Sequence, residues 1–130
     1  MPELNEGLEK AISRGVEVSL IIETDTVGKI GEGHSLLCSF GDIVGQQASF
    51  FYWPFESRRK DSNNRVGSLH VKCAVGDKRN LLLSSANLTG FAFNMNMEMG
   101  ILIRNEELAT KAQCHFKYLI NDGTIAPLIL

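Results

Sequence analysis

Five polar side chains suited to chemistry lie within one short segment of the chain. They are His70, Lys72, Asp77, Ser85 and Asn87, in the spacing H-x-K, four residues, D, and later S-x-N. An imidazole, an ammonium, a hydroxyl and an amide supply a nucleophile, a fixed positive charge and hydrogen-bond donors. Such a set can surround one tetrahedral anion, so the segment predicts a site for a phosphate or a phosphodiester.

The pattern around these residues indicates how the backbone holds them. Within Leu69–Val75, apolar residues alternate with His70 and Lys72, and a β-strand sends alternate side chains to opposite faces. We therefore expect a strand with one face in the core and the chemistry on the other. A turn over Gly76–Asn80, which contains the aspartate, and a returning strand over Leu81–Ser85 complete a hairpin. The hairpin should bring the serine and the asparagine back beside the histidine and the lysine.

Helical and strand patterns interleave along the rest of the chain. Leu4–Arg14 has apolar residues at helical spacing, and Gly15 follows as a natural C-terminal stop. Gly31–Ile43 fits a short helix better than a strand, and Asn87 is placed to cap a helix that runs to about Asn94. The remaining expected elements are a helix over Glu106–Leu119 and strands over Val16–Glu23, Ala48–Trp53, Met97–Ile103 and Ile125–Leu130. This order predicts an α/β fold with a mixed β-sheet flanked by helices, because one hairpin sits inside an otherwise crossover-rich pattern.

Length and composition predict one globular domain over residues 1–130. The chain has 130 residues, of which 44% are hydrophobic, enough for a core of its own. A formal net charge of -2 excludes a generally basic nucleic-acid coat, although a local basic patch can still bind phosphate. One loop carries Arg58, Arg59, Lys60 and Arg65. We expect this loop either to guide a polyanion to the site or to be merely solvated.

The cysteines and the N-terminus indicate the compartment. Cys38, Cys73 and Cys114 are odd in number, widely spaced and set among apolar neighbours. We expect buried free thiols in a reducing compartment, with neither disulfides nor a zinc site. No signal peptide is visible, and no apolar stretch approaches the ~20 residues of a membrane span. We therefore expect a cytoplasmic protein without a transmembrane segment. His34 and His115 lack polar company and are expected to be structural.

The segment Ser68–Gly90 resembles the HKD signature of the phospholipase D superfamily, H-x-K-x4-D-x6-G-S-x-N. It matches at every position but one, because Ser84 replaces the glycine. The resemblance continues in a helix that ends at R-G-V near Val16 and in the N-x-E-x-G segment Asn96–Gly100, and it covers roughly Glu9–Ile103. The strand that ordinarily precedes the first helix of this superfamily is missing, so we expect a truncated domain or a part of a longer protein.

The resemblance implies phosphodiester chemistry by a covalent route that uses no metal and no cofactor. His70 would attack phosphorus and form a phosphohistidine, which water then releases. Lys72 would stabilise the charge of the transition state, while Ser85 and Asn87 would donate hydrogen bonds to the phosphate. Glu98 of the N-x-E segment would hold the other ring nitrogen of the histidine. The alternative for this glutamate is a carboxylate that merely faces solvent.

Two further positions qualify this assignment. Asp77 is a catalytic candidate because it belongs to the signature, although the resemblance implies a mainly structural role, and we rank Glu98 above it. Ser84 adds a hydroxymethyl group that would either crowd the phosphate or supply another donor. Reduced or lost activity is therefore one expected consequence of the serine.

Three functions fit these observations. A nuclease of the phospholipase D-like type is favoured by the basic loop and the expected compartment. A phospholipid-processing enzyme ranks lower because no amphipathic basic helix is visible. A catalytically silent phosphate-binding or nucleic-acid-binding domain is favoured by Ser84. The aromatic run Phe50–Phe55 is expected to be a buried strand leading into a loop, with base stacking or lipid contact as the alternative.

Assembly follows from the count of motifs. The chemistry needs a second histidine to protonate the leaving oxygen, and the chain carries one HKD motif. We expect either a C2 homodimer or a second HKD half in the same polypeptide.

Overall fold

A computed structural model of the chain describes residues 2–24, 40–87 and 94–129. The chain divides into two compact units. Unit 1 comprises Met1–Leu69 together with Gly123–Leu130, and unit 2 comprises His70–Asp122. All the candidate site residues named above belong to unit 2.

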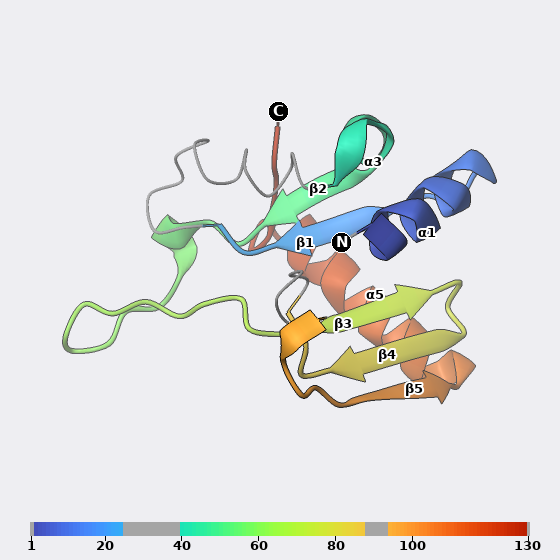
Figure 1. Ribbon diagram of the computed structural model, residues 1–130. Helices are drawn as coiled ribbons and strands as arrows, with labels where there is room; N and C mark the ends of the chain where they lie inside the picture. Colours follow the sequence, from blue (N-terminus) through green and yellow to red (C-terminus); the bar gives the residue numbers. More distant parts are fainter. Residues whose placement is uncertain (1, 25–39, 88–93, 130) are drawn as a thin grey trace. The chain divides into compact units, whose positions relative to one another are not determined.

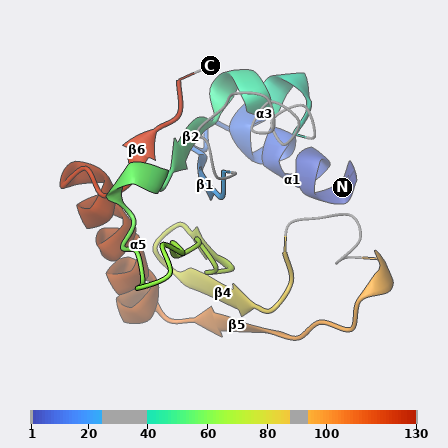
Figure 2. The same cartoon turned by 90° about the vertical axis from the view of Figure 1, so that its left-hand side faces the viewer.

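The described residues of unit 1 form a three-stranded sheet, two α-helices and a short 3-10 helix, Phe55–Ser57 (Figure 1). Strand β2 (Ser49–Tyr52) is central, parallel to β1 (Ser19–Ile22) and antiparallel to β6 (Ala126–Pro127). Helices α1 (Pro2–Ser13) and α3 (Gly41–Gln47) pack against each other, as Figure 2 also shows. The core is formed by four buried residues, Ile22, Phe40, Val44 and Phe50, against which the apolar face of α1 packs.

The end of α1 follows from its sequence. Gly15 has a φ of 82°, a value that glycine adopts without steric cost, and its N–H donates to the carbonyl of Ile12 at 2.8 Å. The helix expected over Leu4–Arg14 and its glycine stop are therefore confirmed. The aromatic strand is confirmed as β2, in which Phe50 is buried and Phe51 and Tyr52 are half-buried.

The described residues of unit 2 form an antiparallel sheet and one long helix. The order is β3 (Cys73–Gly76), β4 (Asn80–Ser84) and β5 (Gly100–Arg104). Helix α5 (Glu106–Asn121) packs against β3 and β4, and Figure 1 shows it along one face of this sheet. The side chain of Asn105 caps the helix by accepting from the N–H of Leu108 at 3.0 Å.

The turn between β3 and β4 is set by Asp77 and Lys78. Both have positive φ, 52° and 56°, and the N–H of Arg79 donates to the carbonyl of Gly76 at 3.0 Å. Two consecutive residues with positive φ match the right-handed twist of the strands that they join, and aspartate tolerates this conformation better than most residues. Asp77 therefore shapes the hairpin.

The α/β class expected from the sequence is confirmed, while the division into sheets and several strand bounds differ in detail. The described strands form two three-stranded sheets, of which that in unit 1 is mixed. Strand β3 begins at Cys73, four residues later than expected. The cause is a bend at Ser85, whose N–H donates to the carbonyl of Met99. The last hydrogen bond between β4 and the segment before β3 is therefore the one from the N–H of Ser84 to the carbonyl of Lys72, at 3.0 Å.

Some expectations fall outside the described residues. They include His34, Cys38 and most of the helix expected between Asn87 and Asn94. Of the two described cysteines, both are free. Cys73 is half-buried, and this burial raises the pKa of its thiol. Cys114 is exposed, so the expectation of a buried thiol is wrong there. Within the described ranges, no helix combines the length and apolar character needed to cross a membrane.

Candidate active site

His70 and Lys72 lie together on the segment that leads into β3. The Nζ of Lys72 donates to the carbonyl of His70 at 2.9 Å and lies 3.4 Å from its Nδ1. The His70 side chain is exposed, while Lys72 is half-buried. The backbone of Lys72 is fixed by its bond to Ser84, so the end of the hairpin holds the ammonium beside the imidazole.

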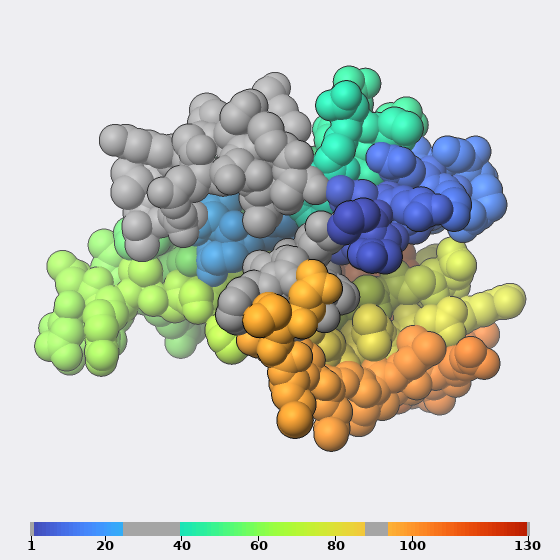
Figure 3. Space-filling view, in the orientation of Figure 1, coloured from blue at the N-terminus to red at the C-terminus, as the bar shows by residue number. Residues whose placement is uncertain are grey.

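Ser85 and Glu98 form the second part of the site. The hydroxyl of Ser85 donates to Oε2 of Glu98 at 2.5 Å and accepts from the N–H of Met99 at 3.1 Å. The side-chain amide of Asn96 donates to the other carboxylate oxygen at 3.2 Å. The three side chains lie just beyond the paired ends of β4 and β5. The segment from Asn96 to Arg104, drawn in orange, is at the surface in Figure 3.

Electrostatics join the two parts of the site. The pKa of Glu98 is lowered, first by the hydrogen bond from the Ser85 hydroxyl, next by that from the Asn96 amide, and further by the positive charge of Lys72. The glutamate is therefore ionised at neutral pH, and the lysine lies within reach of its charge. His70, Lys72, Ser85, Asn96 and Glu98 make up one cluster, which we call the HK cluster.

The lowered pKa of Glu98 leads to a measurable prediction. In a carboxyl carbon NMR titration, the midpoint of Glu98 should lie below the ordinary value of a glutamate. Ser85→Ala should move the Glu98 midpoint upward, because it removes the largest stabilisation of the carboxylate. An unchanged midpoint in the variant would show that the serine hydroxyl does not bind Glu98 in solution.

Two of the predicted residues lie outside the HK cluster. Asp77 is at the turn of the hairpin, the end opposite to Lys72, and the five residue steps between them span about 16 Å at roughly 3.3 Å per residue. Asn87 is exposed and forms no hydrogen bond to the residues that the structure describes. Sequence reasoning gave no role to Asn96, although its place in the N-x-E segment was a signal that it lies close to Glu98.

Comparison with known proteins decides the family. The family described as "Cardiolipin synthase, PLD-like domain" matches residues 1–120, nearly the whole chain. The chain belongs to this family of phospholipase D-like domains. The superfamily expected from the HKD signature is thereby confirmed.

Two solved structures share the fold of this phospholipase D-like chain. NucT from Helicobacter pylori has a TM-score of 0.73 at 19% sequence identity, over 98% of this chain and 75% of that one. The phospholipase D family member Nuc from Salmonella typhimurium has a TM-score of 0.68 at 21% identity, over 99% of this chain and 75% of that one. No curated protein matches the sequence.

The departure from the HKD signature at Ser84 has a local structural role. Its hydroxyl accepts from the N–H of Ala86 at 3.0 Å, so it turns back to its own backbone. Gly100 pairs directly with Ser84 across β4 and β5. A Cβ at position 100 would lie 3.0 Å from the carbonyl oxygen of Leu83 and 3.5 Å from the Ser84 hydroxyl oxygen. The glycine opposite therefore leaves the room that the serine occupies.

This packing predicts that Gly100→Ala destabilises unit 2 by about 1–3 kcal/mol, because the added methyl group forces the backbone of Leu83 to shift. Gly76→Ala, in the same sheet, is a matched control, since its Cβ would meet nothing closer than 3.9 Å. Urea unfolding followed by circular dichroism measures both. Equal stabilities of the two variants would contradict the packing argument.

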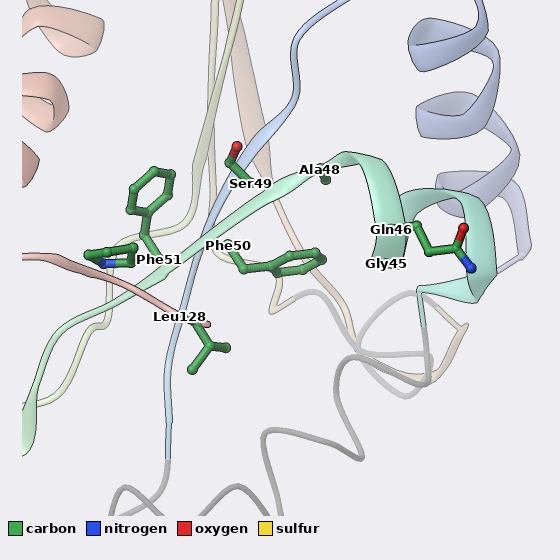
Figure 4. Close-up of a pocket in the computed structure, with 8 residues that line it drawn as sticks. Gly45, Gln46, Ala48, Ser49, Phe50, Phe51 and Leu128 are labelled. Carbon is green, nitrogen blue, oxygen red and sulfur yellow. The ribbon is translucent and has the colours of Figure 1, made fainter. Parts of the chain in front are cut away.

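Unit 1 has an open pocket of about 560 Å³ (Figure 4). Its lining comes from the end of α3, from β2 and from the end of β6 with the residue after it, and Figure 4 shows Phe50, Phe51 and Leu128 among them. None of the lining residues titrates near neutral pH or is a strong nucleophile. The HK cluster, which has both kinds of group, is therefore the candidate active site.

Proposed function

We propose that the chain is a phosphodiesterase, a metal-independent nuclease that acts through a phosphohistidine at His70. The observation that carries this proposal is the HK cluster, in which an exposed imidazole, an ammonium and an ionised carboxylate meet at one end of a hairpin. The match of the family over residues 1–120 and the fold shared with Nuc and NucT support it.

In the first step, a ring nitrogen of His70 attacks phosphorus. A nitrogen–phosphorus bond forms, the bond to the leaving oxygen breaks, and that oxygen takes a proton from an acid. In the second step, water attacks phosphorus and gives a proton to the conjugate base of that acid, the nitrogen–phosphorus bond breaks, and the imidazole is restored. Lys72 stabilises the negative charge that builds on the phosphoryl oxygens. To do so, its Nζ leaves the carbonyl of His70 and donates to a phosphate oxygen instead.

The role of Glu98 at the histidine remains a prediction. Among the described residues, its carboxylate accepts hydrogen bonds from Ser85 and Asn96 and none from the His70 ring. The Nδ1 of that ring lies near the Nζ of Lys72 instead. We propose that binding of a phosphate draws the ammonium away, after which the carboxylate holds the positively charged imidazole. Asp77 acts through the shape of the hairpin turn.

One experiment tests the proposal and the substrate together. Purified protein is incubated with single-stranded DNA, double-stranded DNA, RNA and a phosphatidylcholine analogue in EDTA. We expect cleavage of nucleic acid in the chelator, since no three His, Cys, Asp or Glu side chains group as a metal site within the described part of the chain, and Lys72 supplies the positive charge. Activity that EDTA removes and a divalent metal restores would overturn the mechanism.

A phospholipid substrate is the second candidate, favoured by the cardiolipin synthase description of the matching family. Cleavage of the phosphatidylcholine analogue alone would establish it in place of the nuclease. A chain that binds phosphate analogues but cleaves none of these substrates would be the silent domain. The cytoplasmic location stays a prediction.

We further propose that two chains share one active site in a C2 homodimer, because the leaving oxygen needs a proton from a second histidine. Wild-type and His70→Ala chains are mixed in equal amounts and allowed to form dimers. If the site is shared, only the dimers of two wild-type chains are active, and the activity per chain is about a quarter of the wild-type value. Independent sites keep about half. Light scattering gives the oligomeric state of the same samples. A fully active monomer would refute the shared site, and an inactive monomer would point to a second HKD half.

A further inference from the structure

Arg58 is a buried residue, although the sequence places it in an exposed basic loop. It is 7% exposed, and its guanidinium lies over the ring of Trp53 with 5.1 Å to the centroid. Its Nε and Nη2 donate to the carbonyl of Trp53 at 3.1 and 2.6 Å, and its Nη1 donates to the carbonyl of Gly67 at 3.1 Å. Every nitrogen of the group is engaged, so Arg58 is not available to guide a polyanion.

Glu23, the residue after β1, joins this arginine to the segment before His70. One carboxylate oxygen accepts from Nη2 of Arg58 at 2.5 Å. The other accepts from the backbone N–H of Leu69, also at 2.5 Å. Leu69 directly precedes His70. The carboxylate thus fixes the backbone immediately before the proposed nucleophile, and a buried guanidinium fixes the carboxylate.

We propose that Glu23 is a positioning residue for His70, acting through the Leu69 N–H and itself held by Arg58. The inference rests on the proposed function, in which His70 is the nucleophile. A nucleophile must be held within about 0.5 Å of its productive position, and a misplacement of about 1 Å lowers rates by about 100-fold. Gly67 and Leu69 are both held by this ion pair, so the chain that enters the HK cluster is restrained at two points.

Glu23→Gln tests the inference with almost no change of shape. A carboxylate accepts on both sides, whereas an amide accepts on one side and presents an NH2 group on the other. That NH2 must then face either the Leu69 N–H or the Arg58 guanidinium, both of which are donors. The oxygen that accepts from Arg58 also accepts from the N–H of Thr24 at 3.0 Å, so the amide oxygen keeps that side and the hydrogen bond to Leu69 is lost.

Three measurements follow this variant. Hydrogen exchange at the Leu69 amide should become at least tenfold faster, and kcat for the cleaved substrate should fall at least tenfold with KM nearly unchanged. Tungstate, a phosphate mimic, should bind at least fivefold more weakly, as followed by the His70 ring resonances. Glu56→Gln is the control, since Glu56 is an exposed carboxylate of the same unit, and all three quantities should stay at the wild-type level.

The outcomes separate this inference from the proposed function. Unchanged exchange at Leu69 overturns the inference, and so does faster exchange with wild-type kcat and tungstate affinity. A wild-type chain without hydrolysis refutes the proposed function, yet weaker tungstate binding by Glu23→Gln would still support positioning. Should Glu23→Gln lose the native fluorescence of Trp53, Glu23→Asp replaces it, because it keeps the charge beside Arg58 and shortens the reach to Leu69. Wild-type values of all three quantities in a folded Glu23→Asp protein would also overturn the inference.

Discussion

Replacing His70 with alanine should reduce phosphodiester hydrolysis to the background of the assay. A nucleophile forms the covalent intermediate itself, so binding contacts that remain cannot replace it, and losses on the order of 10⁴-fold or more are expected. The fold should survive, because the His70 side chain is exposed and its ring lies near Lys72 alone among the described polar groups. Initial rates and circular dichroism measure the two expectations.

His115→Ala is the matched control for this variant. His115 is also exposed, on α5, where its ring lies edge-on to Phe116 with 5.9 Å between centroids, and it should be dispensable for turnover. Rapid acid-free quenching of the wild-type reaction should also trap a phosphoryl group on His70, stable in base and labile in acid, that is absent from His70→Ala. Wild-type rates in His70→Ala would remove this residue from the mechanism.

Local patterns predicted the elements that carry the site. The alternation around His70 and Lys72 and the glycine and aspartate of the turn were enough to place a hairpin, which the structure contains as β3 and β4. The helical pattern over Glu106–Leu119 likewise predicted α5. These features depend on residues within a few positions of one another, so the sequence displays them directly.

Contacts between distant residues account for what the sequence did not predict. Arg58 was grouped with an exposed basic loop because its partner Glu23 lies 35 residues earlier. Ser85 was expected to donate to a phosphate, and the sequence did not indicate that its hydroxyl donates to Glu98, 13 residues later. The start of β3 was misjudged because a bend at Ser85 ends its pairing, and nothing in the alternation of Leu69–Val75 records that bend.

The division into two units falls between Leu69 and His70, so the restraint on Leu69 and the HK cluster belong to different units. Under the proposed positioning role of Glu23, a mutation of Glu23 or Arg58 lowers activity without changing any residue of the cluster. Loss of activity alone is thus poor support for a catalytic role, and each variant needs a readout at the cluster itself.

Lys72→Ala provides such a readout, and it should lower kcat by about 10²–10³-fold. The ammonium is proposed to stabilise charge that builds up in the transition state, and removing one such group typically costs about 3–4 kcal/mol. Its loss should also raise the pKa of Glu98, because the positive charge of Lys72 is one of the causes that lower it.

The control is Lys117→Ala, an exposed lysine on α5, which should change neither kcat nor the pKa of Glu98. A higher KM with unchanged kcat would mean that the ammonium binds substrate and transition state equally, and would contradict its catalytic role. A fall in kcat without a shift in the pKa of Glu98 would contradict the place of Lys72 in the cluster. The ammonium would then contact the substrate without lying close enough to Glu98 to lower the pKa of its carboxyl group.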